Sequence, residues 1–269
     1  MKVFLNSCHI CHKEQSEATL VSEIFAEANN SGIYVHTCPM GHTVVHDVKA
    51  RKFDILFGGG LSAICDGYYR EAVANFAACT ERFHEFYCEA IAIKNNVSLE
   101  AFKAVWDSQI RFSERQAGAF YIFYLLENGK PAPKLDSLKL SNQVGDYKYF
   151  RNQVVHNGSI PTRDEALLFG KFTFEYVTSI MNELEKITIN KSDFSGMSLL
   201  EYMHRHKWHE QNLIADKKRQ ELDLPIENTI AYLGGIAGML SLFVANKETV
   251  RDFEYCLKNV EQVHGQRGV

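Results

Sequence analysis

Three cysteines and one histidine near the start of the chain have the types and spacing of zinc ligands. Two residues separate Cys8 from Cys11, and three separate Cys38 from His42. Two such short pairs can meet at one point and supply the sulfur and nitrogen atoms that tetrahedral zinc binds. Because four protein ligands leave no open coordination position, the pattern predicts a structural zinc ion and no catalytic metal.

The surroundings of these residues predict a small zinc ribbon over residues 1–50. Strand-like alternation on both sides of the Pro39–Gly41 turn indicates two strands joined by a metal-binding turn. A unit this short with little apolar content needs a metal to fold. The identity of the fourth ligand is not fixed, because four other histidines lie in the same segment, namely His9, His12, His36 and His46. The alternative is that the cysteines are incidental and bind no metal.

A second group, Arg151, Asn152 and His156, has side chains suited to cleaving a phosphodiester. A histidine that titrates near neutral pH can take the proton from an RNA 2′-hydroxyl or give one to the departing 5′-oxygen. An arginine fork can stabilise the negative charge that develops on the phosphoryl oxygens. This chemistry needs no metal. Arg151 and His156 are therefore predicted to be catalytic, with Asn152 orienting the phosphate or the imidazole.

Helix geometry places two residues that are five apart about 140° from each other around the axis. Arg151 and His156 can still share a site if the helix ends or bends near Asn157–Gly158. A two-fold dimer that brings two Arg/His sets into one cleft is the other route. The alternatives without function are that His156 caps a helix end and that Arg151 pairs with a carboxylate such as Asp146.

The region around Arg151 is locally basic. Residues 130–171 contain seven Lys and Arg against four Asp and Glu, although the whole chain has a net charge of −4. A protein that binds RNA needs cationic side chains near the phosphates. Lys148, Arg163 and Lys171 are therefore predicted to contact RNA.

The elements that must position these residues are predicted to be mainly helical. Apolar residues spaced by three and four indicate helices over 52–65, 68–94, 98–127 and 162–186. Ser98 has the residue type of an N-cap, and Thr162 with Glu165 forms a capping box. The strand signal after residue 50 is weak, so an all-helical bundle is predicted over residues 51–190. Glycines 58–60 indicate close helix packing or a helix break.

Residues 191–269 are predicted to form a C-terminal helical extension. Pro225 is typical of the first turn of a helix. The Gly-rich segment 231–245 is predicted to be a tightly packed internal helix or an oligomer face. Acidic and basic residues are nearly balanced around His204–His209, which indicates a solvated helix face.

Composition excludes several classes of protein. The chain has 269 residues, of which 46% are hydrophobic and 23% charged, as in a soluble globular protein. The charge balance excludes a uniformly basic nucleic-acid coat protein. Its longest apolar stretch is too short for a membrane helix, and its start lacks the apolar region of a signal peptide. Seven cysteines, four of them in helix-like segments, indicate reduced thiols and a cytoplasmic location.

The segment from Leu56 to Lys186 resembles the HEPN domain (higher eukaryotes and prokaryotes nucleotide-binding). The resemblance rests on a set of short motifs: residues 66–73 (Asp-Gly-Tyr-Tyr-Arg-Glu-Ala-Val), Glu81, Arg151-Asn152 followed by His156, Gly158, Pro161-Thr162 and Glu165-Ala166. The family signature is Arg, a polar residue, and His four to six residues after it, and this chain fits that pattern. The resemblance covers about half of the chain.

This resemblance implies an antiparallel helical bundle that dimerises and places paired Arg and His residues in a metal-independent endoribonuclease site. The RNA products would end in a 2′,3′-cyclic phosphate. Many such domains are toxins or anti-phage effectors that arrest growth, and an antitoxin or trigger protein can control them. Other members are non-catalytic and bind nucleotides or partners. The rival prediction is therefore a dimerisation or sensing module that binds nucleic acid or a protein.

Overall fold

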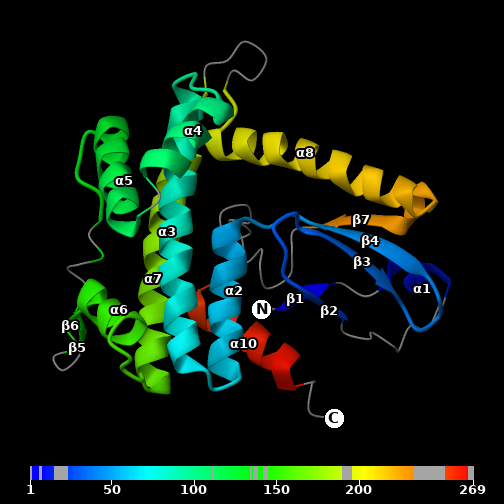
Figure 1. Ribbon diagram of the computed structural model, residues 1–269, viewed down its shortest axis with the longest axis horizontal. Helices are drawn as coiled ribbons and strands as arrows, with labels where there is room; N and C mark the ends of the chain where they lie inside the picture. The colour runs from blue at the N-terminus through cyan, green and yellow to red at the C-terminus, as the bar shows by residue number, and fades with distance from the viewer. Residues whose placement is uncertain are drawn as a thin grey trace.

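The structure is a computed structural model in which a helical body lies beside a small sheet (Figure 1). It describes residues 2–5, 8–14, 24–110, 112–133, 135, 139–141, 145–189, 196–232 and 252–265. The predicted mainly helical class is confirmed. Among the described residues, no helix is both long enough and apolar enough to cross a membrane.

Six helices form the body: α2 (Lys52–Cys65), α3 (Tyr69–Lys94), α4 (Leu99–Gln109), α5 (Ser113–Asn128), α6 (Tyr147–Val155) and α7 (Arg163–Glu185). The helix α3 is central and packs against α2, α5, α6 and α7 (Figure 1). The core between them is rich in fully buried aromatic rings, among them Phe53, Phe57, Phe76, Phe83, Phe120 and Phe169. Burial of each such ring stabilises the fold by about 1.5–3 kcal/mol, which explains why these amphipathic helices associate.

Two glycines let three helices approach closely. A Cβ atom on Gly60 of α2 would lie 2.5 Å from the ring of Phe76 on α3, and one on Gly170 of α7 would lie 2.7 Å from the same ring. Phe76 is fully buried between them. Of the two predicted roles for glycines 58–60, close helix packing is confirmed at Gly60, and the helix break is wrong because α2 continues through all three residues.

The predicted single helix over 98–127 is wrong, because the chain forms α4 and α5 instead. The helix α5 runs in the same direction as α3. Near its start, Gln116 accepts a 2.8 Å hydrogen bond from Arg82, and near its end Glu127 pairs with Lys94 at 2.5 Å. The chain must therefore travel back along α3 before α5 begins, which one straight helix cannot do.

Local signals at helix starts agree with the structure. The Ser98 hydroxyl accepts a hydrogen bond from the backbone N–H of Ala101 at 3.2 Å. Thr162 and Glu165 form the predicted capping box, with the Thr162 N–H donating to the Glu165 carboxylate at 2.8 Å. These bonds satisfy backbone donors that the first turn leaves unpaired.

The sheet begins as the predicted hairpin. Strands β3 (Ile33–Thr37) and β4 (Thr43–Val48) pair antiparallel, with Val35 opposite Val45. A third strand, β7 (Thr229–Tyr232), pairs parallel to β4. Near this sheet, β1 (Lys2–Leu5) pairs with β2 (Ile24–Glu27). A separate pair, β5 (Lys139–Ser141) with β6 (Gly145–Asp146), lies next to α6 on the other side of the body (Figure 1).

The prediction of an all-helical bundle over residues 51–190 is therefore wrong at β5 and β6, and β7 is a further strand that the weak signal after residue 50 did not reveal. The strands β5, β6 and β7 have two to four residues each, too few for an alternating pattern to be visible. Pro225 also starts no α-helix, because it precedes the 3₁₀ turn η2 (Ile226–Asn228) that leads into β7.

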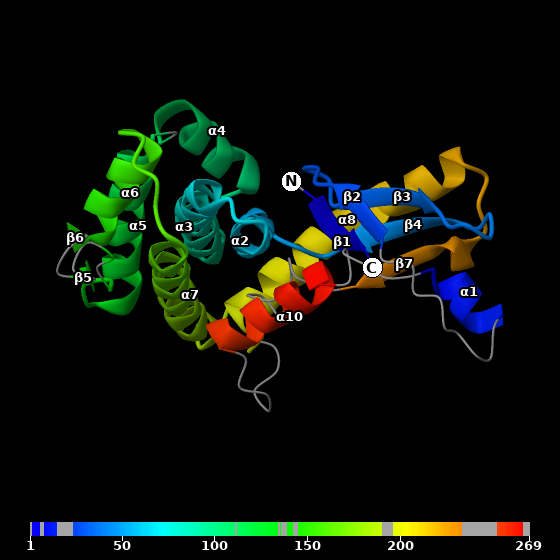
Figure 2. The ribbon, with the colours of Figure 1, turned by 90° about the horizontal axis from the view of Figure 1, so that it is seen from below.

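The described part of residues 191–269 packs on both the sheet and the body. The long helix α8 (Leu199–Glu221) spans the sheet beside β4, as Figure 1 shows, and α10 (Phe253–Gly265) packs against α2 and α7 (Figure 2). Of the segment 231–245, only its first two residues are described, in β7, so the predicted internal helix lies outside the described residues. The division at residues 50 and 190 stays a prediction.

Candidate functional site

Cys8, Cys11, Cys38 and His42 form a cluster that can hold a metal ion. Their ligand atoms all lie within 4.8 Å of one another. The Cys11 and Cys38 sulfurs are 3.6 Å apart, and His42 Nδ1 lies 3.2 Å from the Cys11 sulfur and 3.7 Å from the Cys38 sulfur. Among the described residues, this is the one group of three or more Cys, His, Asp or Glu side chains whose ligand atoms lie close enough together to bind one metal ion.

Two tight turns bring the four ligands together. Cys8 immediately precedes α1 (His9–Glu14), whose first turn carries Cys11. Between β3 and β4, the Cys38 N–H donates to the His42 carbonyl and the Gly41 N–H to the Cys38 carbonyl, both at 2.9 Å. Gly41 has a φ of +86°, a conformation that glycine adopts at no steric cost. This turn explains why three intervening residues suffice.

The turn also prepares the Cys38 thiol to bind a cation. Burial by itself raises the pKa of Cys38, but hydrogen bonds from the backbone amides of His42 and Met40, together with those from the Cys11 and Cys8 thiols, lower it to about 7. A thiolate is the form of cysteine that coordinates metals.

His42 is the histidine that completes the cluster. The other candidates with described side chains, His9, His36 and His46, lie outside it. His9 instead contacts the backbone carbonyl of Glu227 in η2 through Nε2. The side chain of His12 is not among those described.

Arg151 lies on α6 with its guanidinium group turned towards α3. It donates to the Glu81 carboxylate at 2.7 Å and to the Asn152 side-chain oxygen at 3.0 Å. Asp146, the alternative partner, instead caps α6 by accepting a bond from the Tyr149 N–H at 2.7 Å. Arg151 is thus held by a residue 70 positions earlier in the chain, next to Asn152.

His156 occupies the C-cap position of α6 and is exposed. Its backbone N–H donates to the Asn152 carbonyl at 3.0 Å, and the chain then turns at Gly158, which has a φ of +76°. The helix therefore ends before Asn157–Gly158, as the first predicted route to a joint site requires. His156 also sits at a helix end, as the alternative without function expected.

The three predicted RNA contacts differ in their surroundings. Lys148 is exposed on α6, the helix that carries Arg151. Arg163 and Lys171 lie on α7 and form ion pairs with α10, to Glu261 at 3.0 Å and to Glu254 at 3.2 Å. Lys148 is therefore the one that the structure places on the same helix as the Arg/His group.

Sequence analysis missed a cleft between the body and α8. Arg51, Lys103 and Lys207 line it, and they come from three elements far apart in the sequence. The predicted solvated face at His204–His209 is wrong for Lys207, which is half-buried and donates to the Ala50 carbonyl at 3.0 Å. No spacing pattern could reveal this group, since packing alone brings its members together.

Compared with protein-family models, with curated proteins and with solved structures, the chain gives no match. Support for a function therefore comes from the arrangement of these side chains.

Proposed function

We propose that Cys8, Cys11, Cys38 and His42 bind a structural zinc ion. Tetrahedral zinc, with Zn–S near 2.3 Å and Zn–N near 2.0 Å, sets two sulfurs about 3.8 Å apart and a sulfur and a nitrogen about 3.5 Å apart. The distances of 3.6, 3.2 and 3.7 Å in the cluster are close to these values. Three soft sulfurs and one imidazole form a donor set that selects zinc over magnesium or calcium.

We further propose that the chain is a metal-independent endoribonuclease of the HEPN type. The main support is the pairing of Arg151 with Glu81 and Asn152, together with the exposed His156 at the C-terminal end of the same helix. A guanidinium has five N–H donors, so these two bonds leave others for a phosphoryl oxygen. An exposed histidine at the end of the same helix can exchange protons with a bound substrate.

The proposed reaction is attack of the RNA 2′-oxygen on the adjacent phosphorus, with release of the 5′-oxygen. One His156 takes the 2′-hydroxyl proton, and a protonated imidazole gives a proton to the departing 5′-oxygen. Arg151 stabilises the charge on the non-bridging oxygens. The products end in a 2′,3′-cyclic phosphate and a 5′-hydroxyl.

A homodimer would supply the second imidazole. Exposed large apolar side chains gather on α5 and near it, namely Phe112, Ile122, Leu125 and Leu126, and Tyr149 is exposed on α6. Both helices lie on the side of the body away from the sheet (Figure 1, Figure 2). Apolar side chains of this size favour a protein contact. A two-fold pair formed there would bring the two α6 helices close to each other.

In the cell, this activity would serve a toxin or anti-phage effector that arrests growth, controlled by an antitoxin or trigger protein in the cytoplasm. The alternative is a non-catalytic HEPN module that dimerises and binds nucleic acid or a protein. Under that alternative the ion pair between Arg151 and Glu81 would hold α6 on α3 and do nothing else.

The test is cleavage of total cellular RNA by the zinc-loaded full-length protein, in metal-depleted buffer with no added divalent cation. We expect wild-type protein to cut, and both Arg151→Ala and His156→Ala to lose at least about 100-fold in rate, as expected for removal of a general acid–base or of a charge-stabilising donor. Lys217→Ala, an exposed change on α8, is the control and should keep full activity.

Two other outcomes contradict the proposal. Cutting that survives both substitutions would place the site elsewhere. No cutting by folded wild-type dimer, together with no growth arrest on expression, would favour the non-catalytic module.

A further inference from the structure

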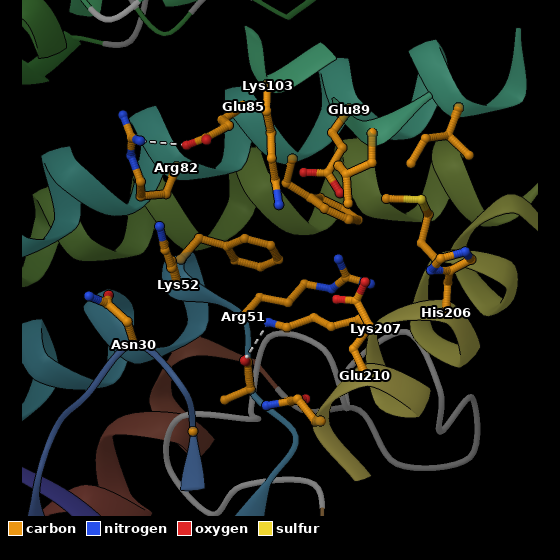
Figure 3. A pocket seen from close by; sticks show the side chains of 18 of the residues that line it. Asn30, Arg51, Lys52, Arg82, Glu85, Glu89, Lys103, His206, Lys207 and Glu210 are labelled. Carbon is orange, nitrogen blue, oxygen red and sulfur yellow. Dashed lines mark hydrogen bonds and ion pairs between the residues drawn. The ribbon is translucent and has the colours of Figure 1, made fainter. Parts of the chain in front are cut away.

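A cleft of about 720 Å³ opens between the body and α8 (Figure 3). Its walls come from α2, α3, α4, α8 and the chain before β3. This volume lies in the range of small-molecule sites. The cleft does not include Arg151 or His156, so it is distinct from the proposed cleavage site.

Arg51, at the start of α2, is a buried cation with unused donors. Its side chain is only 7% exposed, and its Nε and one terminal nitrogen have no hydrogen-bond partner. The guanidinium lies 3.9 Å from the centre of the Phe86 ring. Since burial of a charge without paired donors is costly, this arrangement calls for a ligand that accepts hydrogen bonds.

Further cations surround Arg51. The side chains of Lys52 and Lys103 reach into the same hollow from α2 and α4, and Lys207 approaches from α8 (Figure 3). Burial, and then repulsion by Arg51, lowers the pKa of Lys207 to about 8. Positive groups this close destabilise one another, and a bound anion would relieve that repulsion.

Acidic groups offset only part of this charge, because four cations, Arg51, Lys52, Lys103 and Lys207, meet two carboxylates at the deep end. Glu85 is paired with Arg82 at 2.5 Å, as the dashed line in Figure 3 marks. Burial raises the pKa of Glu89, whereas attraction to Arg51, Lys103 and Lys207 lowers it, so Glu89 is a counterion of these three cations. The buried carboxylate of Asp54 acts in the same way on Arg51 and Lys207. Glu100 and Glu210 are exposed at the rim, where water screens them.

The remaining wall of the cleft is apolar and includes Phe53, Leu56, Phe86, Ile93 and Val97. A bare inorganic anion would leave this surface in water, whereas an organic group would cover it. We propose that the cleft binds a small phosphate monoester, with its phosphate on Arg51, Lys103 and Lys207 and its organic group on the apolar wall. Phosphate is favoured because three donors from different directions suit a tetrahedral group of oxygens better than a planar carboxylate.

The test is calorimetric titration of the zinc-loaded full-length protein with phenyl phosphate, which joins a phosphate to an apolar ring. Inorganic phosphate and phenol test the two halves separately. We expect phenyl phosphate to bind at least about tenfold more tightly than either half, since both surfaces contribute. Binding no tighter than that of inorganic phosphate would overturn the apolar part of the proposal.

Arg51→Met keeps the contact with Phe86 and removes the charge, and Lys207→Met removes a cation from the opposite wall. Each should weaken phenyl phosphate binding by about 10- to 100-fold, the effect of losing one charged hydrogen bond. Lys217→Met, on α8 outside the cleft, should bind like the wild type. If Arg51→Met does not fold, the comparison of phenyl phosphate binding by wild type and Lys207→Met tests the proposal.

No binding to the wild type at millimolar phenyl phosphate, or equal binding by wild type and Lys207→Met, would overturn the proposal. Because this readout involves no RNA, its failure is distinguishable from failure of the proposed cleavage activity.

Discussion

At the scale of single residues, His84 shows how burial decides protonation. It lies on α3 with its ring stacked on Phe120, the centroids 4.3 Å apart, and its Nε2 is 2.9 Å from the Tyr176 hydroxyl. Burial lowers the pKa of His84 from 6.5 to about 3. The folded protein therefore keeps this imidazole neutral at a pH where the unfolded chain binds a proton.

His84 should make the protein sensitive to acid. Its folded pKa lies below its unfolded pKa, so the stability it contributes is present above pH 6.5 and is lost as the pH falls towards 3. Between pH 6 and 4, the unfolding free energy should fall by about 1.4 kcal/mol per pH unit more in wild type than in His84→Gln. Denaturant titrations at several pH values measure this. Equal slopes in the two proteins would contradict the assignment.

At the scale of elements, the spacing between helices depends on residues that have no side chain. Gly60 and Gly170 contact opposite sides of the Phe76 ring, so α2, α3 and α7 share one tight contact. Gly118 in α5 is the useful contrast, because a Cβ atom there would meet nothing within 4 Å. Both kinds of glycine look alike in the sequence.

Alanine substitutions should distinguish the two packed glycines, Gly60 and Gly170, from the unpacked Gly118. Gly60→Ala and Gly170→Ala should each lower the unfolding free energy by about 1–3 kcal/mol, because the new methyl group forces the buried Phe76 ring out of place. Gly118→Ala should raise it by up to about 1 kcal/mol, since alanine favours the helix and nothing opposes it. Thermal or urea unfolding of the three variants provides the comparison. A stabilising Gly60→Ala would show that α2 can move away from α3 at little cost.

At the scale of the whole molecule, α8 connects the sheet to the body. On the sheet side, Gln211 donates to the Ser31 carbonyl at 3.2 Å, and Lys49 donates to the Asn212 side chain at 2.8 Å. At its other end, Leu199 and Leu200 belong to the core of the body. The Cys8, Cys11, Cys38 and His42 cluster lies at the far end of the hairpin that α8 covers, so the proposed zinc ion would order the sheet together with these local bonds.

Loss of the metal should therefore act mainly on the sheet. In Cys38→Ser, zinc content should fall, and amides of β3, β4 and the adjoining half of α8 should exchange about 100-fold faster or more, because structural zinc contributes folding free energy directly. The amides of α3 and α7 should stay protected by the aromatic core. Hydrogen exchange with metal analysis tests this, and His36→Ala is the control from the same hairpin. Equal loss of protection in α3 would mean that sheet and body unfold as one unit.

Short-range features of this protein follow from its sequence. The Thr162–Glu165 capping box, the Ser98 cap and the Cys38–His42 turn all join atoms within four residues, so residue type and spacing are enough to predict them. The amphipathic period of α3 likewise predicts which face is buried. For the same reason the four members of the candidate metal cluster could be named in advance, although four further histidines remained open as the fourth ligand.

Long-range features were decided by the tertiary structure alone. The partner of Arg151 is Glu81 and not the nearby Asp146, the strand β7 joins β4 from the other end of the chain, and Arg51 meets Lys207 across the cleft. Each of these depends on which elements pack together and in which direction. The free energy of packing is shared among many side chains, so no local sequence pattern predicts it. For the same reason, the sequence did not show that α4 and α5 are separate helices between which the chain reverses along α3.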